Sequence, residues 1–223
     1  MALTWVYLRL QWRNGFYAAA IFVAVVWIAI LRFLPLDEFP QWVPLMIFAN
    51  LQITTFYFAA GQVLLDIQEG TLPAQWLAGI NHRRYCLALA LSLGLLAGLE
   101  NGLIVGLGTD LLLFDINLWF GIALLSALYV QSGLTLALQY QQVNEFLLPS
   151  MLAVTFLSLP LGPYLNLFHL PLLDLHPFTL GLKLLSGDLT GPFWLWTSST
   201  IVWVVWMDRY LANRMANRVQ QSV

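Results

Sequence analysis

The sequence predicts an all-α integral membrane protein with a single domain, residues 1–223, and three observations lead to that prediction. First, 60% of the 223 residues are hydrophobic and only 9% are charged, whereas a soluble domain carries about 25% charged residues to cover its surface. Second, six apolar stretches approach the roughly 20 residues that a helix needs to cross the hydrocarbon layer. Third, no internal repeat, linker or low-complexity tract divides the chain. We therefore expect one bundle of six transmembrane helices.

The predicted spans follow one another along the chain at 15–34, 42–64, 85–108, 117–139, 147–168 and 191–210. The fifth contains Pro160 and Pro163, which neighbouring helices can accommodate by taking up the freed carbonyl groups. The sixth begins with Pro192, at a position where the missing N–H would be unpaired anyway. Tryptophans near the span ends are typical of a membrane interface; they are Trp42, Trp119, Trp194, Trp196 and Trp206.

Two further segments are neither spans nor ordinary loops. Residues 3–15 carry polar side chains at a helical spacing that suits a helix lying in the membrane interface; they are Thr4, Tyr7, Gln11 and Asn14. Residues 170–191 are too apolar for a solvated loop and too interrupted for a span. We expect one or two short helices there, dipping into the outer leaflet before the last span.

The basic residues predict the orientation of the bundle. With six spans both termini lie on one side, and that side collects Arg9, Arg13, Arg83, Arg84, Arg209, Arg214 and Arg218. The other side has only Arg32 and Lys183. Because cytoplasmic loops carry the excess of Lys and Arg, we expect both termini and the 66–84 loop on the cytoplasmic side of a cell (inner) membrane. The formal net charge of −2 does not point to a nucleic-acid partner.

Motifs for catalysis or cofactor binding are absent from the sequence. It contains no GxxxxGK[ST] phosphate loop, no HExxH, no Cys-x-x-Cys and no G-x-S-x-G, and Cys86 is its only cysteine. His169, Asp174 and His176 are close in sequence and could in principle bind a metal. Polar residues at the water-facing edge of short helices explain them more simply. We therefore expect no catalytic residue, no bound metal and no cofactor in this chain.

Two predicted spans carry polar residues along one helical face. The second span has Asn50, Thr54 and Tyr57, and the fifth has Thr155, Ser158 and Asn166. Small and hydroxylated residues let membrane helices pack closely, so helix packing is one interpretation. The other is that both faces line a pathway for a substrate, and the two interpretations are compatible.

Glu100 and Asn101 form a second intramembrane polar site. Glu100 lies about 22 Å along a helix that starts at Tyr85, in the outer half of the third span. Acids at such a depth are rare and usually face the bundle interior or an aqueous cavity. The residue is either a structural hydrogen-bonding group or a site for a proton or cation.

The loop 66–84 contains its own short helix. Thr71 can cap a helix whose first turn contains Leu72 and Pro73, and Gly79 suits its end. Leu72, Trp76 and Leu77 would then be available to a partner protein or to the membrane surface. An ordinary amphipathic turn at the interface is the alternative interpretation.

This loop resembles the segment after the second span of ABC-2 type transporter permeases. That family has an acidic-Gly-Thr-Leu core, a short helix, and then a basic pair with a tyrosine that leads into the third span. The corresponding residues are Glu69, Gly70, Thr71, Leu72, Arg83, Arg84 and Tyr85. The segment VNEFLLPS, residues 143–150, is also similar, and the chain is most like the fluoroquinolone-export permease subunits. Gly79–Asn81 departs from the family, which often has a proline-containing turn there.

The resemblance implies a function and its partners. The short helix would be a coupling helix that docks on a separate ABC ATPase subunit through Glu69, Gly70, Thr71, Leu72, Trp76 and Leu77. ATP and Mg would bind that subunit, so the chain would not be an enzyme by itself. A second permease chain, identical or homologous, would pair with it, and the second and fifth spans of both would form the central interface. The complex would export an amphipathic small molecule, drug-like or lipid-like.

Two other classes of function remain open at this point. The chain could be a membrane assembly or sensor subunit without transport activity, in which the polar faces only pack helices. It could instead be a proton-coupled secondary transporter that uses Glu100. Within the ABC class, a haem- or lipid-handling permease of similar size is a further alternative.

Overall fold

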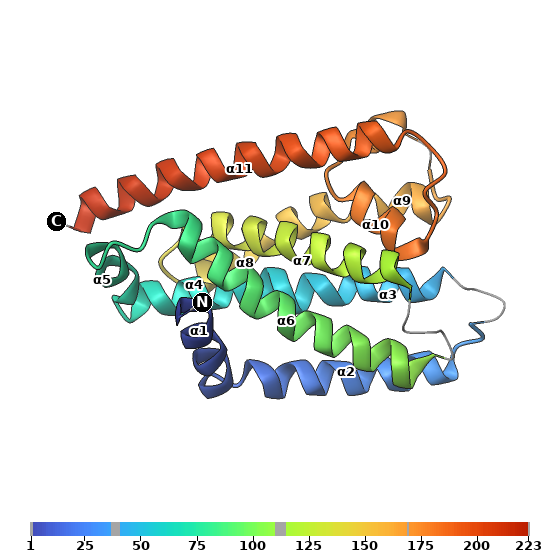
Figure 1. Ribbon diagram of the computed structural model, residues 1–223, viewed down its shortest axis with the longest axis horizontal. Helices are drawn as coiled ribbons and strands as arrows, with labels where there is room; N and C mark the ends of the chain where they lie inside the picture. Colours follow the sequence, from blue (N-terminus) through green and yellow to red (C-terminus); the bar gives the residue numbers. More distant parts are fainter. Residues whose placement is uncertain (1, 37–40, 110–114, 169, 223) are drawn as a thin grey trace.

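The computed structural model describes residues 2–36, 41–109, 115–168 and 170–222; residues 2, 73, 76, 77 and 216–222 are described by their backbone alone. Every regular element within these ranges is a helix, which confirms the all-α prediction. The long helices run side by side along one axis of the molecule, and α1 (Ala2–Arg13) crosses them at one end (Figure 1). The short helix α5 (Thr71–Leu77) lies at that same end, which we call the α5 end.

Four helical stretches of the described chain are long and apolar enough to cross a membrane. They are α2 (Phe16–Phe33), the continuous stretch Trp42–Gln68, α6 (His82–Gly108) and α7 (Ile116–Ala137). These four coincide with the first four predicted spans. Because the stretch Trp42–Gln68 contains a π-helical turn, it divides into α3 (Trp42–Leu51), η1 (Gln52–Tyr57) and α4 (Phe58–Gln68).

The last two predicted spans have a different form. The helix α8 (Val143–Leu157) has only 15 residues, and a turn at Pro160 separates it from the short α9 (Leu161–Tyr164). The last helix, α11 (Phe193–Ser222), has 30 residues but is rich in Trp, Ser and Thr, so it is less apolar than the four stretches above. Six membrane crossings therefore remain a prediction.

The helix α7 lies at the centre of the bundle. It packs against α4, η1, α6 and α10 (Thr179–Ser186), whereas α2 packs mainly on α6 at the edge of the bundle. The outer face of α2 exposes large apolar side chains such as Phe22 and Val25. In water such a surface would be unfavourable, and it suits a helix whose outer face meets lipid.

A glycine allows α7 to approach the π-helical turn closely. A Cβ atom placed on Gly133 would lie 2.4 Å from the carbonyl oxygen of Phe56, which is far inside van der Waals contact. Because the contacted atoms belong to the backbone, no side-chain rotation could make room for it. Only glycine therefore fits at this crossing of α7 and η1.

The polar face of α1 is turned towards the protein. Tyr7 and Gln11 are fully buried, and the Gln11 amide nitrogen donates a hydrogen bond to the Ser92 hydroxyl of α6 at 2.8 Å. Trp5 and Trp12 are exposed on the other side of the helix. The periodicity thus predicted a helix with one polar face, but this face packs on α6 through buried hydrogen-bond partners, and the position of α1 in the membrane interface stays a prediction.

The segment before α11 forms two short helices, η2 (Pro171–Leu175) and α10, and α10 packs on α7. Of the suggested metal-binding group, His169 lies outside the described residues and Asp174 is exposed. His176 is buried, not water-facing as expected, because its ring packs against those of Phe156 and Phe178. This burial lowers the pKa of His176 to about 4, so its imidazole is neutral at ordinary pH.

Candidate functional site

The candidate site is the α5 end of the bundle, where α5 connects α4 to α6. Gly70 and Gly79 flank the helix with positive φ angles of 68° and 80°, which glycine adopts without steric cost. The N–H of Ile80 donates to the Gln75 carbonyl at 3.1 Å, so Gly79 ends the helix as the sequence predicted. Thr71 acts differently from the predicted cap, because its hydroxyl donates to the Asp66 carbonyl at 3.1 Å. This bond ties the start of α5 to the end of α4.

The predicted coupling residues have different environments. Glu69 and Gly70 are exposed, and Thr71 is half-buried. Leu72 is only 2% exposed and belongs to the core of this chain, so it holds α5 against the bundle and is not free for a partner. The side chains of Trp76 and Leu77 lie outside the described part of the structure. The outward surface with described side chains therefore consists of Gln68, Glu69, Gly70, Ala74, Ala78 and Gly79.

Asp66 is the centre of a buried hydrogen-bond network directly behind α5. Its Oδ2 accepts hydrogen bonds from the hydroxyls of Tyr7 at 3.0 Å and Tyr85 at 2.9 Å, and its Oδ1 accepts one from the Gln62 amide at 3.0 Å. The amide nitrogen of Gln75 donates to the Tyr7 hydroxyl at 3.1 Å. Asp66 is 2% exposed, and a buried carboxylate is stable only where such donors surround it.

The Asp66 network joins four helices at one point. Tyr7 comes from α1, Asp66 and Gln62 from α4, Gln75 from α5, and Tyr85 from α6. Burial, together with the negative charge of Asp66, raises the pKa of Tyr7, so its hydroxyl stays protonated and continues to donate. Displacing α5 would therefore pull on the ends of two long apolar helices.

Sequence reasoning missed this network. The sequence pattern gave Asp66 no role beyond its place at the start of the 66–84 loop, and Tyr85 none beyond the family motif. The sequence nevertheless contains a signal for it. An acid buried at the end of an apolar helix requires hydrogen-bond donors, and the hydroxyls of Tyr7 and Tyr85 are possible donors. Their long sequence separations, 59 residues for Tyr7, hide the contact until the fold is known.

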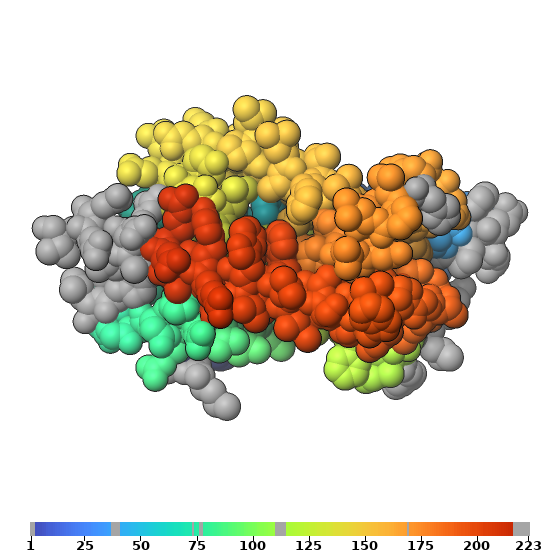
Figure 2. Space-filling model, turned by 90° about the horizontal axis from the view of Figure 1, so that it is seen from above, coloured from blue at the N-terminus to red at the C-terminus, as the bar shows by residue number. Residues whose placement is uncertain are grey.

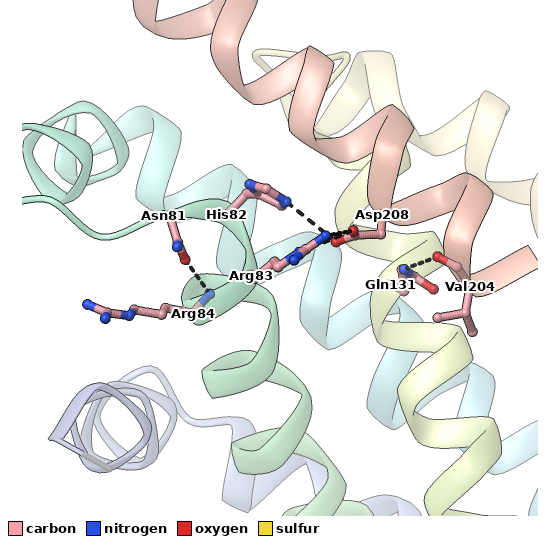
Figure 3. Close-up of polar contacts among 7 residues, drawn as sticks. All are labelled: Asn81, His82, Arg83, Arg84, Gln131, Val204 and Asp208. Atoms are coloured by element: carbon pink, nitrogen blue, oxygen red, sulfur yellow. Dashed lines mark hydrogen bonds and ion pairs between the residues drawn. The ribbon is translucent and has the colours of Figure 1, made fainter. Parts of the chain in front are cut away.

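A second link joins the same region to the last helix. The Arg83 guanidinium lies 2.9 Å from Asp208 Oδ2 of α11, and His82 Nε2 lies 3.4 Å from Asp208 Oδ1 (Figure 3). The N–H of Arg84 donates to the Asn81 side chain at 2.9 Å, so Asn81 caps the start of α6. The Arg84 side chain extends away from Asp208 in Figure 3. The two arginines of the basic pair therefore differ: Arg83 binds α11 and Arg84 remains exposed.

A hydrogen bond from α7 holds α11 one turn before Asp208. The Gln131 amide nitrogen donates to the Val204 carbonyl at 3.2 Å (Figure 3). Since Val204 lies four residues before Asp208, the two contacts fall on neighbouring turns of α11. The α5-end half of α11 is thus tied to both α6 and α7.

The polar face of the second span lies inside this chain. Asn50 is fully buried, accepts a hydrogen bond from the Trp27 indole at 3.1 Å and donates one to Asn101 at 3.2 Å. Thr54 is also fully buried, and its hydroxyl donates to the Asn50 carbonyl at 3.1 Å. Tyr57 is half-buried against Phe146. These contacts bind α2, α3 and α6 together within one protomer.

The polar residues of the fifth span are placed apart from that face. Thr155 and Asn166 are exposed, and Asn166 has a positive φ of 55°. The Ser158 hydroxyl accepts a hydrogen bond from Gln52, which also donates to Tyr129. The chain alone therefore does not bring the two predicted faces together, and Gln52, which the sequence pattern did not single out, forms the hydrogen bond between Ser158 and the second span.

Glu100 is buried beside the Asn50 cluster. It is 3% exposed, and neither carboxyl oxygen has a hydrogen bond among the described residues. Asn50 and Thr54 lie within electrostatic reach of the carboxyl, but their contacts do not meet hydrogen-bond geometry. Asn101, in contrast, has partners for both of its side-chain polar atoms, because its amide nitrogen donates to the Ala97 carbonyl at 2.8 Å and its oxygen accepts from Asn50.

Comparison with known proteins agrees with this architecture. The model of the fluoroquinolones export permease protein family matches residues 2–213. Fluoroquinolones export permease proteins from two strains of Mycobacterium tuberculosis are each 30% identical over 185 residues, covering 81% of this chain and 76% of theirs. No solved structure matches the chain. The family match includes α1, the Asp66 network, α5 and the Arg83–Asp208 contact, and the chain belongs to the fluoroquinolones export permease protein family.

Proposed function

We propose that the chain is the transmembrane permease subunit of an ABC exporter that moves an amphipathic small molecule across the cell membrane. ATP would be hydrolysed on a separate ABC ATPase subunit, and a second permease chain, identical or homologous, would complete the pathway. The observation that carries the proposal is the placement of α5. This short helix lies at one end of the bundle, directly after the exposed Gln68 and Glu69, and partly buried hydrogen bonds connect it to α4 and α1.

The contacts around α5 suit the transmission of force from a motor subunit. A push on α5 would act through Gln75 and Thr71 on the Asp66 network, and from there on α1, α4 and α6. The Arg83–Asp208 pair would carry the same displacement to α11. Packed helices change between discrete arrangements and do not bend continuously, so a small displacement at α5 can tip a bundle between two states.

In this proposal the α5 end faces the cytoplasm, since it carries most of the basic residues. Gln68→Cys and Leu189→Cys, each in a Cys86→Ser background, should then react from opposite sides of the membrane. A membrane-impermeant maleimide added to intact cells should label only the cysteine at 189, and permeabilised cells should allow labelling at 68. Labelling of both positions in intact cells would contradict the orientation.

Transport in inside-out vesicles tests the function directly. Vesicles from cells that lack their own drug pumps, expressing the chain together with a candidate ABC ATPase subunit, should accumulate ciprofloxacin when ATP is added. An ATPase whose phosphate-loop lysine is replaced by alanine is the matched control and should abolish accumulation. Accumulation that is equal with both ATPases would overturn the proposal.

The same vesicles distinguish the rival functions. The buried Glu100 carboxyl, which has no hydrogen bond among the described residues, favours a proton-coupled carrier as the second candidate. A protonophore would stop accumulation by such a carrier and leave accumulation by an ABC exporter unaffected. Glu100→Gln should likewise stop accumulation only if the chain is a proton-coupled carrier. A non-transporting sensor subunit would give no accumulation under any of these conditions.

A further inference from the structure

The chain contains a groove between α8 and α11 that no predicted site residue lines. Figure 2 shows the hollow between the yellow of α8 and the red of α11. The cavity has a volume of about 250 Å³, and α7 and the π-helical turn η1 contribute to its lining. The helix α11 packs on α7 and α10, and this leaves a gap on its α8 side.

Aromatic rings form one wall of this α8–α11 groove. Trp203, Trp206 and Tyr210 follow one another along α11, with ring centroids 5.6 Å and 6.0 Å apart. Phe156 of α8 faces Trp203 at 6.4 Å with nearly parallel rings. Trp206 is 54% exposed and Phe156 is 47% exposed, so both offer free ring surface to a ligand.

A polar strip along α7 and the turn after it contributes to the same cavity. It consists of Ser132 and Thr135 of α7 and of Gln139 in the turn, and none of the described residues that line the groove is charged. The hydroxyls of Ser132 and Thr135 donate to carbonyls of their own helix, to Leu128 at 2.8 Å and Gln131 at 2.7 Å. Both oxygens therefore retain lone pairs that can accept a hydrogen bond from a ligand.

These properties select among the possible occupants. A lipid acyl chain would gain nothing from the polar strip, and a helix of a second copy, about 10 Å wide, is too large for the cavity. A flat ring system with one polar edge matches both the aromatic wall and the strip. The volume is close to the lower end of the 300–1,000 Å³ range of drug-binding pockets.

We propose that the α8–α11 groove is a binding site for flat, amphipathic aromatic molecules, which stack on Trp206 and Phe156 and place a polar edge against Ser132 and Thr135. Ser132 and Thr135 lie in the α5-end half of α7, and Trp203–Tyr210 lie in the half of the predicted span 191–210 that is nearer the α5 end. If, as proposed above, the chain is an exporter with this end in the cytoplasm, the groove receives substrate from the inner half of the membrane. The role in export rests on that proposed function, whereas binding itself does not.

Ciprofloxacin binding to the full-length chain in lipid nanodiscs, without ATP, tests the site. The anisotropy of the drug's own fluorescence gives its Kd. We expect Trp206→Ala to weaken binding at least fivefold, and Thr135→Val, which keeps the side-chain shape, to weaken it at least threefold. The matched control is Trp194→Ala, an exposed tryptophan of the same helix outside the groove, which should change the Kd less than twofold.

Several results would overturn the site. These are no binding to the wild-type chain, equal binding by Trp206→Ala, or equal weakening by Trp194→Ala. Should Trp206→Ala lower the melting temperature, Phe156→Leu gives the same test from the α8 side. Lipids brominated in their acyl chains should quench the fluorescence of Trp206 less once ciprofloxacin is bound. Unchanged quenching would mean that an acyl chain occupies the groove.

The binding and transport results can fail independently. Binding that depends on Trp206, without ATP-driven accumulation, would support the site and contradict the exporter. Accumulation that Trp206→Ala leaves intact would support the exporter and contradict the site. A variant that loses both binding and accumulation, while Trp194→Ala keeps both, would support the two together.

Discussion

Replacement of Asp66 by alanine is expected to lower the free energy of unfolding by about 2–5 kcal/mol, because it removes the acceptor for three buried donors at once. Tyr7, Tyr85 and Gln62 would be left buried at the junction of α1, α4 and α6 without that partner. Unpaired buried polar groups cost more than the net value of the bonds they once made. The variant should melt roughly 5–10 °C lower in detergent than the parent chain.

Glu69→Ala is the matched control for Asp66→Ala. Glu69 is also an acid, only three residues later, but it is exposed, so its removal should leave the melting temperature almost unchanged. Asp66→Asn keeps one acceptor and should fall between the two. If Asp66→Ala melted like Glu69→Ala, the network would not hold α5 to the bundle.

The network also makes a prediction about coupling that a purely structural role would not. Tyr85→Phe removes a single donor and leaves the tyrosine ring, which packs edge-on against Tyr7 at 5.7 Å. If the chain is the ABC exporter proposed above, assembly with the ATPase should survive this change, while the ATP hydrolysed per transported molecule should rise. If the ATP hydrolysed per transported molecule did not change, the Asp66 network would contribute to stability and not to coupling.

The sequence predicted well what depends on composition and local pattern. Four long apolar stretches and the single polar face of α1 follow from hydropathy and spacing, and Gly79 ends α5 as expected because its αL conformation is a local preference. Features of this kind need no knowledge of which helices are neighbours.

What the sequence could not show is the pairing of distant residues. Leu72 looked available to a partner because a seven-residue helix has no visible inner face until α4 and α11 pack against it. Arg83 looked like one half of a basic pair, and only the position of α11, 125 residues later, shows its acidic partner. Gln52 and Asp66 were passed over for the same reason. Each pairing depends on tertiary packing, which periodicity does not encode.

Gly133 is the position where a single added side chain should have the largest effect on packing. Its missing Cβ would lie 2.4 Å from the Phe56 oxygen and 3.1 Å from the Phe56 carbonyl carbon, whereas ordinary contacts begin at 3.4 Å. To accept any side chain, α7 would have to move away from η1 by about 1 Å, since 3.4 minus 2.4 is 1.0. The hydrogen bond from Gln52 to Tyr129, 3.2 Å long and one turn away on α7, would lengthen with that movement.

We expect Gly133→Val to destabilise the chain by about 3 kcal/mol or more, at the upper end of overpacking effects, because the obstacle is backbone and α7 packs against several other elements at the centre of the bundle. Gly94→Val is the matched control: Gly94 also lies inside a long helix, but its Cβ would have no atom within 4 Å. Both variants pay the same small propensity cost of valine, so the difference between their melting temperatures measures the α7–η1 contact alone. Equal melting temperatures would show that α7 does not approach the π-helical turn this closely. A large drop confined to Gly133→Val would establish the contact between α7 and the π-helical turn that the fold requires.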